Sequence, residues 1–437
     1  MTLTQQLITL IRGKQVDDSD LQRAALFTLD AVCNAIAGRN TEAGRKLQQW
    51  RKTQGNDAGR DAFLFGGLTH ILETDDLHRG SVTHPGCVVI PAALALAGDN
   101  SGKKILTAVL YGFDAMCRVG NAVGPTHYRM WHNTATCGPY GSAMAAATLL
   151  NLSDDETMHA LGNAGTQSSG VWEFLETGAM SKHLHAGRAA ESGITAAQLA
   201  ATGFTGPPAI LEGDKGFFAA ACPDANAGDV VADPEQPWQL LQTSIKPWPC
   251  CRHTHPVVDA ALELHDKLGG NAIESVAIET YQAALDVCDR PQPDNEYAAK
   301  FSLQHTVAAA LTDGQIRFDS FDDKARASFA ALRGRVTISA GEPFASAYPV
   351  AWGARVSLTL ADGSTIAAER PTARGDPELA LSDAEMIAKA ELLLDFAGCD
   401  AATTRRIIDG MLSLAGADNS REIVEFLLLL SKSETRP

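Results

Sequence analysis

The sequence has no long apolar run and no excess of positive charge. None of its segments reaches about 18 consecutive apolar residues, the length that a membrane-spanning helix needs, so we expect no transmembrane segment. The formal net charge is −16, which argues against nonspecific binding to nucleic acid or to an anionic membrane. Against this acidic background, a local cluster of cations indicates a specific anionic ligand.

The chain also lacks the short motifs of several large enzyme classes. It contains no Rossmann glycine fingerprint, P-loop, G-x-S-x-G, H-E-x-x-H or paired C-x-x-C. The N-terminal apolar segment is too short and too polar for a secretory signal. We therefore expect the nine cysteines to be reduced thiols in a cytoplasmic protein. The adjacent Cys250 and Cys251 would form a strained disulfide, and we expect them to be inert.

Hydrophobic periodicity predicts a mainly α-helical protein of two domains, a number that the length of 437 residues also favours. Residues 1 to about 220 contain successive helical patterns without convincing strand alternation, and one of these patterns predicts a helix from Ala62 to about Asp75. Alternating segments occur only later, at residues 274–281, 335–339, 354–360 and 365–368. Asp362-Gly363 has the composition of a hairpin turn between the last two. We therefore predict a large all-helical domain built from both termini, residues 1–267 and 386–437, and a smaller α+β domain, residues 268–385.

The most informative stretch begins at Gly178. Four basic residues fall within seven positions, Lys182, His183, His185 and Arg188. They lead into residues 189–201, a predicted helix of small side chains that must pack closely against other helices. Cations at the start of a buried helix are costly unless an anion pairs with them. We therefore favour an anion site here over a solvated helix start.

Two other polar clusters also come before predicted buried helices. The first contains Glu73 and the paired carboxylates Asp75 and Asp76, followed by His78 and His84. The second contains Lys246, Arg252, His253 and His255. His132 precedes a further helix of small residues. The free N–H groups of a helix start bind anions, and histidine exchanges protons near neutral pH.

This inventory suits acid–base chemistry on a small polycarboxylate. Lysine and arginine would hold carboxylates, a histidine or aspartate would remove a proton α to a carboxylate, and cations would stabilise the resulting charge. Elimination of water, decarboxylation and epimerisation are then accessible. The two H-x-H pairs, His183/His185 and His253/His255, could instead bind a metal with Asp75 and Asp76, but the lysines and arginines beside them would repel a divalent cation. A metal-dependent hydrolase and a noncatalytic carboxylate-binding protein are therefore the less favoured alternatives.

Six segments resemble blocks of the MmgE/PrpD family, in the order in which that family carries them. They are DDLHRGSVTHPG (75–86), TATCGPYG (134–141), GAMSKHLHAGRAAESG (178–193), GFTGPP (203–208), KPWPCCRHTHP (246–256) and FSLQHTVAAALTDG (301–314). The resemblance covers nearly the whole chain. It implies a mostly helical large domain made from both termini, a smaller α+β domain that acts as a lid, and a homodimer that needs neither a metal nor an organic cofactor. Members of the family include 2-methylcitrate dehydratase, cis-aconitate decarboxylase and iminodisuccinate epimerase.

The resemblance also assigns roles to residues. It implies that the catalytic residues are His84, Lys182, His255 and Asp75. We expect His84 and His255 to act as acid and base, Lys182 to hold a carboxylate or stabilise charge, and Asp75 to orient a histidine or share its proton. The predicted substrate-binding residues are Asp76, His78, His132, His185, Lys246, Arg252 and His305.

Two positions depart from the family's pattern. Leu77 stands where the family usually has threonine, and His305 stands where the decarboxylase branch has tyrosine. Our main hypothesis is therefore an enzyme that abstracts a proton α to a carboxylate of a small di- or tricarboxylate, as a dehydratase or an epimerase. A cis-aconitate-type decarboxylase is the alternative.

Overall fold

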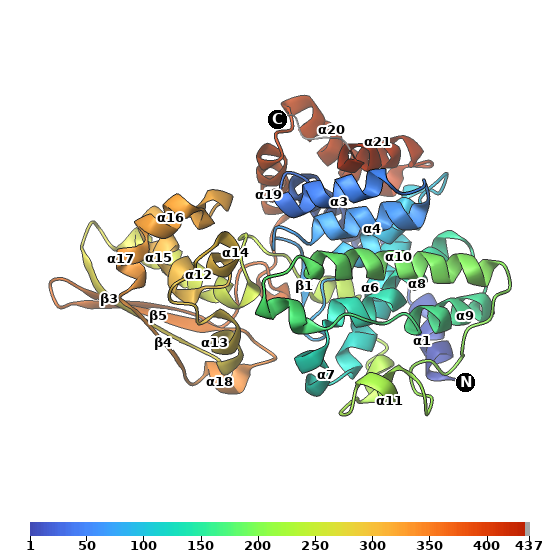
Figure 1. Ribbon diagram of the computed structural model, residues 1–437, viewed down its shortest axis with the longest axis horizontal. Helices are drawn as coiled ribbons and strands as arrows, with labels where there is room; N and C mark the ends of the chain where they lie inside the picture. The colour runs from blue at the N-terminus through green and yellow to red at the C-terminus, as the bar shows by residue number, and fades with distance from the viewer. Residues whose placement is uncertain (433–437) are drawn as a thin grey trace. The chain divides into compact units, whose positions relative to one another are not determined.

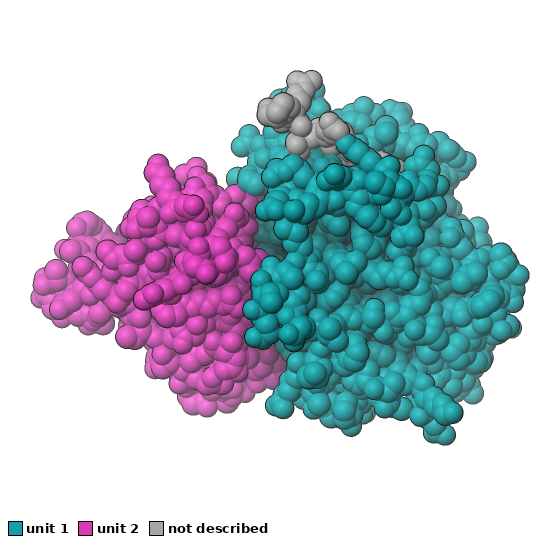
Figure 2. All heavy atoms as spheres, in the orientation of Figure 1, with its two compact units in different colours: residues 1–243, 382–437 teal, residues 244–381 magenta. Residues whose placement is uncertain are grey.

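The computed structural model describes residues 1–432 (Figure 1). The contacts divide the chain into two compact units, shown in teal and magenta in Figure 2. Unit 1 contains residues 1–243 and the C-terminal residues from 382, whereas unit 2 contains Ser244–Leu381. Within the described residues, no helix is both long enough and apolar enough to cross a bilayer.

Unit 1 is helical. Its α-helices are α1 (Leu3–Gly13), α2 (Asp18–Gly38), α3 (Glu42–Lys52), α4 (Ala58–Thr69), α5 (Gly86–Ala95), α6 (Gly102–Ala122), α7 (Pro125–Met130), α8 (Asn133–Leu149), α9 (Asp154–Gly165), α10 (Ser181–Ala201), α11 (Phe217–Ala221), α19 (Asp383–Phe396), α20 (Ala401–Leu412) and α21 (Arg421–Lys432). Short elements connect them, namely β1 (Leu77–His78), η1 (Trp172–Glu176), η2 (Ala227–Val230), η3 (Gln239–Gln242) and η7 (Leu414–Gly416). The short strand β2 (Thr243–Ser244) leads out of this unit.

Small residues let α10 pack directly against α8 and α4. A Cβ atom at Gly193 would lie 2.1 Å from Ser142 Oγ, and one at Gly187 would lie 2.5 Å from the carbonyl oxygen of Phe63. The expected close packing of this helix is therefore confirmed. The structure begins α10 earlier than the sequence suggested, at Ser181, so Lys182 lies inside its first turn and not before it.

Unit 2 combines a four-stranded sheet with helices. Its strands are β3 (Ile273–Thr280), β4 (Val336–Ala340), β5 (Ala354–Leu360) and β6 (Thr365–Arg370), in the spatial order β4-β3-β5-β6. Its helices are η4 (Arg252–Thr254), α12 (His255–Lys267), α13 (Gln282–Cys288), α14 (Glu296–Lys300), α15 (Leu303–Asp313), η5 (Phe318–Phe321), α16 (Asp323–Ser328), α17 (Ala330–Arg333), α18 (Phe344–Ala347) and η6 (Pro377–Leu379). The predicted fold class, mainly helical with a smaller α+β part, is thus confirmed.

The sheet is mixed, and its register follows the hydrophobic alternation. β3 runs parallel to β4 and antiparallel to β5, with Ile278 opposite both Ile338 and Val356. Alternate residues of β5 are buried, and α12 packs against β5, β6 and α15. This packing places α12 in unit 2, whereas the sequence-based division at residue 267 grouped its residues with the helical part. The reason is that its apolar face, including Val257 and Leu264, is buried in the core of unit 2.

Candidate active site

The loop between α4 and α5 carries most of the polar residues predicted for unit 1. Periodicity suggested a helix that continues to about residue 75, but α4 ends at Thr69 and the chain turns at His70. Glu73 has a φ of 61° and Val82 a φ of 50°, a backbone conformation that is unfavourable for residues other than glycine and that occurs often at functional sites. Lys389 Nζ donates a hydrogen bond of 2.6 Å to the carbonyl oxygen of Thr74, which helps to fix this buried loop.

Asp76 holds the end of this loop against α5. Its two carboxylate oxygens accept hydrogen bonds of 3.0 and 2.9 Å from the backbone N–H of Gly86, the first residue of that helix. A carboxylate at a helix N-terminus is stabilised by the unpaired N–H groups and by the helix dipole. The Asp76 carboxylate, predicted to bind substrate, is therefore used at least in part to cap α5.

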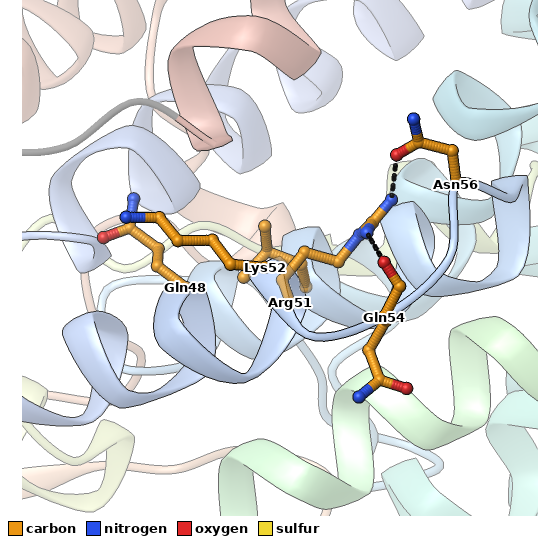
Figure 3. Close-up of a pocket in the computed structure, with 6 residues that line it drawn as sticks. Gln48, Arg51, Lys52, Gln54 and Asn56 are labelled. Carbon is orange, nitrogen blue, oxygen red and sulfur yellow. Dashed lines mark hydrogen bonds between the residues drawn. The ribbon is translucent and has the colours of Figure 1, made fainter.

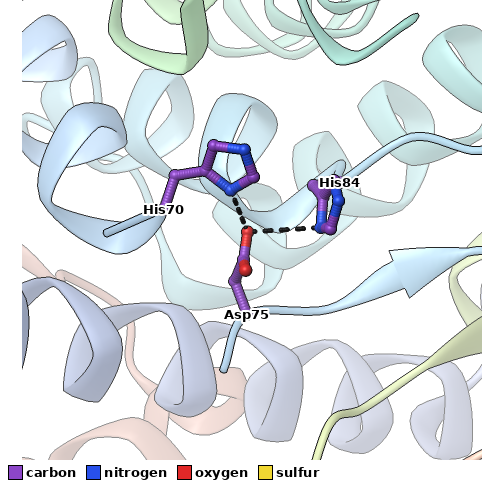
Figure 4. A group of neighbouring side chains, drawn as sticks. All are labelled: His70, Asp75 and His84. Atoms are coloured by element: carbon purple, nitrogen blue, oxygen red, sulfur yellow. Dashed lines mark hydrogen bonds and ion pairs between the residues drawn. The ribbon is translucent and has the colours of Figure 1, made fainter. Parts of the chain in front are cut away.

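Asp75 lies between two histidines (Figure 4). Its Oδ2 atom is 2.5 Å from Nδ1 of His70 and 3.4 Å from Nδ1 of His84. Nδ1 of His84 is also 2.5 Å from the carbonyl oxygen of Asp76. Both neighbours of this nitrogen accept hydrogen bonds, so Nδ1 of a neutral His84 carries the proton and Nε2 carries the lone pair. A histidine held in this way can accept a proton at Nε2, and the Asp75 carboxylate stabilises the resulting imidazolium.

Two further histidines extend this cluster. His132, which precedes α8, packs its ring parallel to that of His70 at 5.7 Å, and its Nδ1 is 3.3 Å from Nδ1 of His185 on α10. Aromatic rings cover the pair, with Trp172 at 4.7 Å from His132 and Phe174 at 5.4 Å from His185. Burial lowers the pKa of His132 well below its ordinary value, and burial and the charges of neighbouring groups lower the pKa of His185 to about 4. Both rings are therefore neutral near pH 7.

Lys182 forms an ion pair with Glu73, so the first turn of α10 contacts the loop after α4. Both side chains are buried, at 8% and 3% exposure. The next residue, His183, has its pKa lowered to about 3, chiefly by burial. The predicted carboxylate-holding lysine therefore already contacts one carboxylate of the protein.

Sequence reasoning assigned no role to His70 or Glu73. His70 fell inside a predicted helix, and a single histidine in an apolar helical pattern gives no local signal of a site. Glu73 belonged to the recognised group of charges, but its contact with Lys182 spans 109 residues of sequence. Only the folded chain shows that these two residues lie with Asp75, His84 and Lys182.

His78 contributes to the internal structure of the same loop. Its Nδ1 is 2.8 Å from Ser81 Oγ, and burial, aided by the charge of Arg79, lowers its pKa to about 4. The backbone of His78 also pairs with that of Thr83. These contacts give His78 a role in shaping the loop, whereas it was predicted to bind substrate.

Unit 2 carries the other predicted site residues. Lys246 and His255 are buried, and Nε2 of His255 is 3.2 Å from the carbonyl oxygen of Cys250. Arg252 pairs with Asp376, while its Nε and Nη1 atoms are buried and have no hydrogen-bond partner among the described residues. Nε2 of His305 is 2.8 Å from the carbonyl oxygen of Ser320, and burial lowers the His305 pKa to about 4. Arg252 thus retains the clearest capacity to bind an anion in this unit.

A metal-binding arrangement is conceivable at one place in the described part of the chain. Potential ligand atoms of His70, Asp75 and His84 all lie within 4.8 Å of one another. This group contains neither of the H-x-H pairs that suggested a metal from the sequence. The observed contacts are those of hydrogen bonds, because both Nδ1 atoms face the same carboxylate oxygen and a backbone carbonyl also contacts His84. We therefore interpret the group as a proton-handling cluster.

A separate pocket of about 200 Å³ lies in unit 1 beside α3 (Figure 3). Its lining residues are Gln48, Arg51, Lys52, Gln54, Asn56 and Leu64. Arg51 pairs with Asp61 at 2.7 Å and donates hydrogen bonds to Gln54 and Asn56, so its charge is already compensated. The pocket contains no histidine, and we assign it no part in the acid–base cluster.

The fold and this cluster define a two-unit protein in which buried histidines, carboxylates and a lysine can move protons. The chain belongs to the MmgE/PrpD family: its residues 5–228 match the MmgE/PrpD N-terminal domain, and its residues 248–414 match the C-terminal domain. The family resemblance seen in the sequence is thereby confirmed.

The curated relatives carry related names. The chain is 25% identical to the cis-aconitate decarboxylase-like protein oryM of Aspergillus oryzae, over 97% of this chain and 95% of that protein. It is 28% identical to the cis-aconitate decarboxylase of Aspergillus terreus, over 82% of each chain. It is 26% identical to the cis-aconitate decarboxylase of Mus musculus, over 88% of this chain and 85% of the mouse protein.

Proposed function

We propose that this protein is a lyase that decarboxylates a small polycarboxylate of the cis-aconitate type. The proposal rests mainly on one observation, the contact of His84 with Asp75 beside the Lys182–Glu73 ion pair. It is supported by the names of relatives that align over most of the chain. These relatives favour the decarboxylase over our main hypothesis from the sequence, a dehydratase or an epimerase.

The proposed reaction requires a positive charge and a proton donor. When the bond to the departing carboxylate breaks, its electron pair stays on the substrate and spreads toward a remaining carboxylate, and CO2 leaves. Lys182 would stabilise that charge, and a protonated His84, held by Asp75, would deliver a proton to carbon. His132 and His185 border the same cluster and would contact the substrate as neutral hydrogen-bonding groups.

Proton abstraction by a neutral His84 remains the second candidate, as the first step of a dehydratase or an epimerase. Leu77 favours it, because this buried residue of β1 supplies no hydroxyl where the family usually has threonine. His305 favours it as well, since both of its ring nitrogens contact unit 2 groups, Ser320 and Arg333, and no phenol is available at that position. The same cluster can serve both reactions because a histidine can give or take a proton.

Proton NMR in D2O tests the proposal with a panel of cis-aconitate, 2-methylcitrate, citrate and iminodisuccinate stereoisomers. We expect release of CO2 from cis-aconitate and one solvent deuteron at a product carbon. His84→Gln should reduce turnover by about 100-fold or more, which is the size of a typical general acid–base contribution. His159→Gln is the matched control, because this α9 histidine contacts the backbone of Gly206 outside the cluster.

The outcomes separate the candidates. Dehydration or stereoinversion without CO2 release would replace decarboxylation by the second candidate. Folded protein that turns over none of these compounds would contradict both. The expected homodimer and the expected independence from metals and organic cofactors belong to the proposal too. Light scattering after size-exclusion chromatography tests the first, and elemental analysis with activity after chelation tests the second.

A further inference from the structure

We propose that His70 is a positioning residue that holds the Asp75 carboxylate beside His84 and thereby stabilises the protonated form of His84. The inference deepens the proposed function, because it rests on His84 as the group that exchanges protons with the substrate. No role was predicted for His70 from the sequence.

The backbone places His70 rigidly. It follows the last residue of α4, and its own N–H bonds to the carbonyl oxygen of Leu68. The preceding residue, Thr69, is anchored by its hydroxyl to the carbonyl oxygen of Phe65 at 2.9 Å. The His70 side chain is completely buried. A side chain on the end of a packed helix is held more firmly than one on a loop, which is what a positioning residue requires.

The ring of His70 lies between two other histidines of the cluster. It meets the His84 ring edge to face at 4.7 Å, and it stacks on the His132 ring at 5.7 Å with an interplanar angle of 12°. Packing on both sides leaves the His70 ring little freedom to rotate. Its Nδ1 therefore stays directed at Oδ2 of Asp75, at 2.5 Å.

One carboxylate oxygen serves both histidines. The contact with His70 is shorter than the contact with His84, 2.5 Å against 3.4 Å, so His70 is the group that sets the position of Oδ2. A carboxylate accepts hydrogen bonds, so Nδ1 of His70 carries a proton and donates it. The tautomer of the neutral His84 ring is fixed by the carbonyl oxygen of Asp76, at 2.5 Å from Nδ1. By holding Oδ2 in place, His70 keeps a negative charge 3.4 Å from the same nitrogen, which favours the protonated form of His84.

Other charged and titratable groups surround His70. They are Asp75, His84, His132, His183 and His185, and the paired Lys182 and Glu73 act on the neighbouring His183. A change of His70 therefore alters the local field as well as one hydrogen bond. The test consequently needs a variant that keeps the hydrogen bond and removes only the ring.

Long-range proton–nitrogen NMR of protein with 15N-labelled histidine tests the inference without any substrate. The His84 signals are assigned by their loss in His84→Gln. In the wild type we expect His84 as the Nδ1–H tautomer. The same signals, followed as the pH is lowered, report protonation of His84. The pKa of His84 should be lower in His70→Ala than in the wild type, because the Asp75 charge is no longer held beside the ring, whereas His70→Asn, whose amide N–H can replace Nδ1–H, should retain the wild-type pKa. Circular dichroism confirms that each variant is folded.

Kinetics with the substrate found for the wild type give a second readout. His70→Ala should lower kcat by about 10- to 100-fold with little change in KM, as is typical when the partner that orients a reacting group is removed. It should also shift the pH profile of kcat/KM, and His70→Asn should restore much of both. Wild-type protein without turnover would contradict the proposed function, yet the NMR test of His70 would stand.

Two results would overturn the inference. One is a folded His70→Ala protein with the same His84 signals and the same pH profile as the wild type. The other is a stoichiometric divalent metal in the purified protein whose removal changes the His70 and His84 signals together, because these residues would then be metal ligands.

Discussion

Lys182 and Glu73 form a buried ion pair between the first turn of α10 and the loop after α4. The two residues are 109 positions apart in the chain. Burial of two charges is costly, and such pairs contribute little net stability compared with apolar residues of similar volume. The pair therefore suggests a functional reason for the ammonium group. Under the proposed function, a substrate carboxylate would share Lys182 with Glu73.

Breaking this pair should destabilise unit 1. Lys182→Met removes the ammonium partner of a buried carboxylate, a change that costs about 3–5 kcal/mol in comparable cases. The double variant Lys182→Met with Glu73→Gln should recover much of that loss, because neither member of the pair is then charged. Urea unfolding of the wild type, Lys182→Met, Glu73→Gln and the double variant measures the coupling between the two residues. The exposed Lys215→Met is the control and should change stability by less than about 0.5 kcal/mol. A coupling energy near zero would contradict this account.

Phe174→Ala should raise the pKa of His185. The Phe174 ring is 5.4 Å from that of His185, and burial is the largest cause of the low His185 pKa of about 4. Removing the ring admits water, which stabilises the imidazolium and moves the pKa toward the ordinary value of 6.5. Histidine NMR titration measures the shift. The control is Leu175→Ala, a change at an exposed neighbour, which should leave the His185 pKa unchanged. If the His185 pKa is also unchanged in Phe174→Ala, the Phe174 ring does not control it.

Acid should destabilise the protein through its buried neutral histidines. Burial lowers the pKa of His253 from 6.5 to about 3, so between these pH values the unfolded chain binds a proton that the folded chain does not. The contribution is complete above pH 6.5 and is lost as the pH falls through this window. His253→Phe removes that titration while keeping a ring against Trp352, whose ring centroid lies 4.4 Å from that of His253.

The variant should be less stable at pH 7, because the Tyr281 hydroxyl loses its 2.7 Å contact with His253. As the pH falls, its free energy of unfolding should nevertheless decrease less steeply than that of the wild type, with a difference in slope of up to about 1.4 kcal/mol per pH unit. Urea unfolding at pH 7, 6, 5 and 4 gives both values. Equal slopes for the two proteins would show that His253 is not the group responsible.

The fold was more predictable than the site because its signals are local. Alternation along residues 354–360 and 365–368 predicted β5 and β6 with nearly their observed bounds, and Gly363 occupies the left-handed position of the hairpin between them. Small residues in α10 likewise indicated its close packing, since the helical period places them on several faces. Each of these signals lies within one segment.

The contacts of the site are not local, and they escaped sequence reasoning for that reason. The apolar pattern around Leu68 and Leu72 extends beyond α4, so it could not show that the helix ends at Thr69 and exposes His70 to Asp75. The motif resemblance assigned His84 and Lys182, but not their partners. Long-range pairing depends on how α10 packs against α4, which no single segment encodes.

Arg252 should bind a polycarboxylate through unit 2. Its side chain is only 3% exposed, it pairs with Asp376, and its Nε and Nη1 atoms have no acceptor among the residues that the structure describes. Buried N–H groups without acceptors are unfavourable, and a carboxylate matches the planar geometry of a guanidinium. Citrate should therefore raise the melting temperature of the wild type, since a ligand that binds only the folded state stabilises it. Arg252→Lys keeps the positive charge near Asp376 but loses the planar fork, so the citrate-induced rise should be much smaller at equal ionic strength. Equal rises in the two proteins would exclude Arg252 from the binding of the anion.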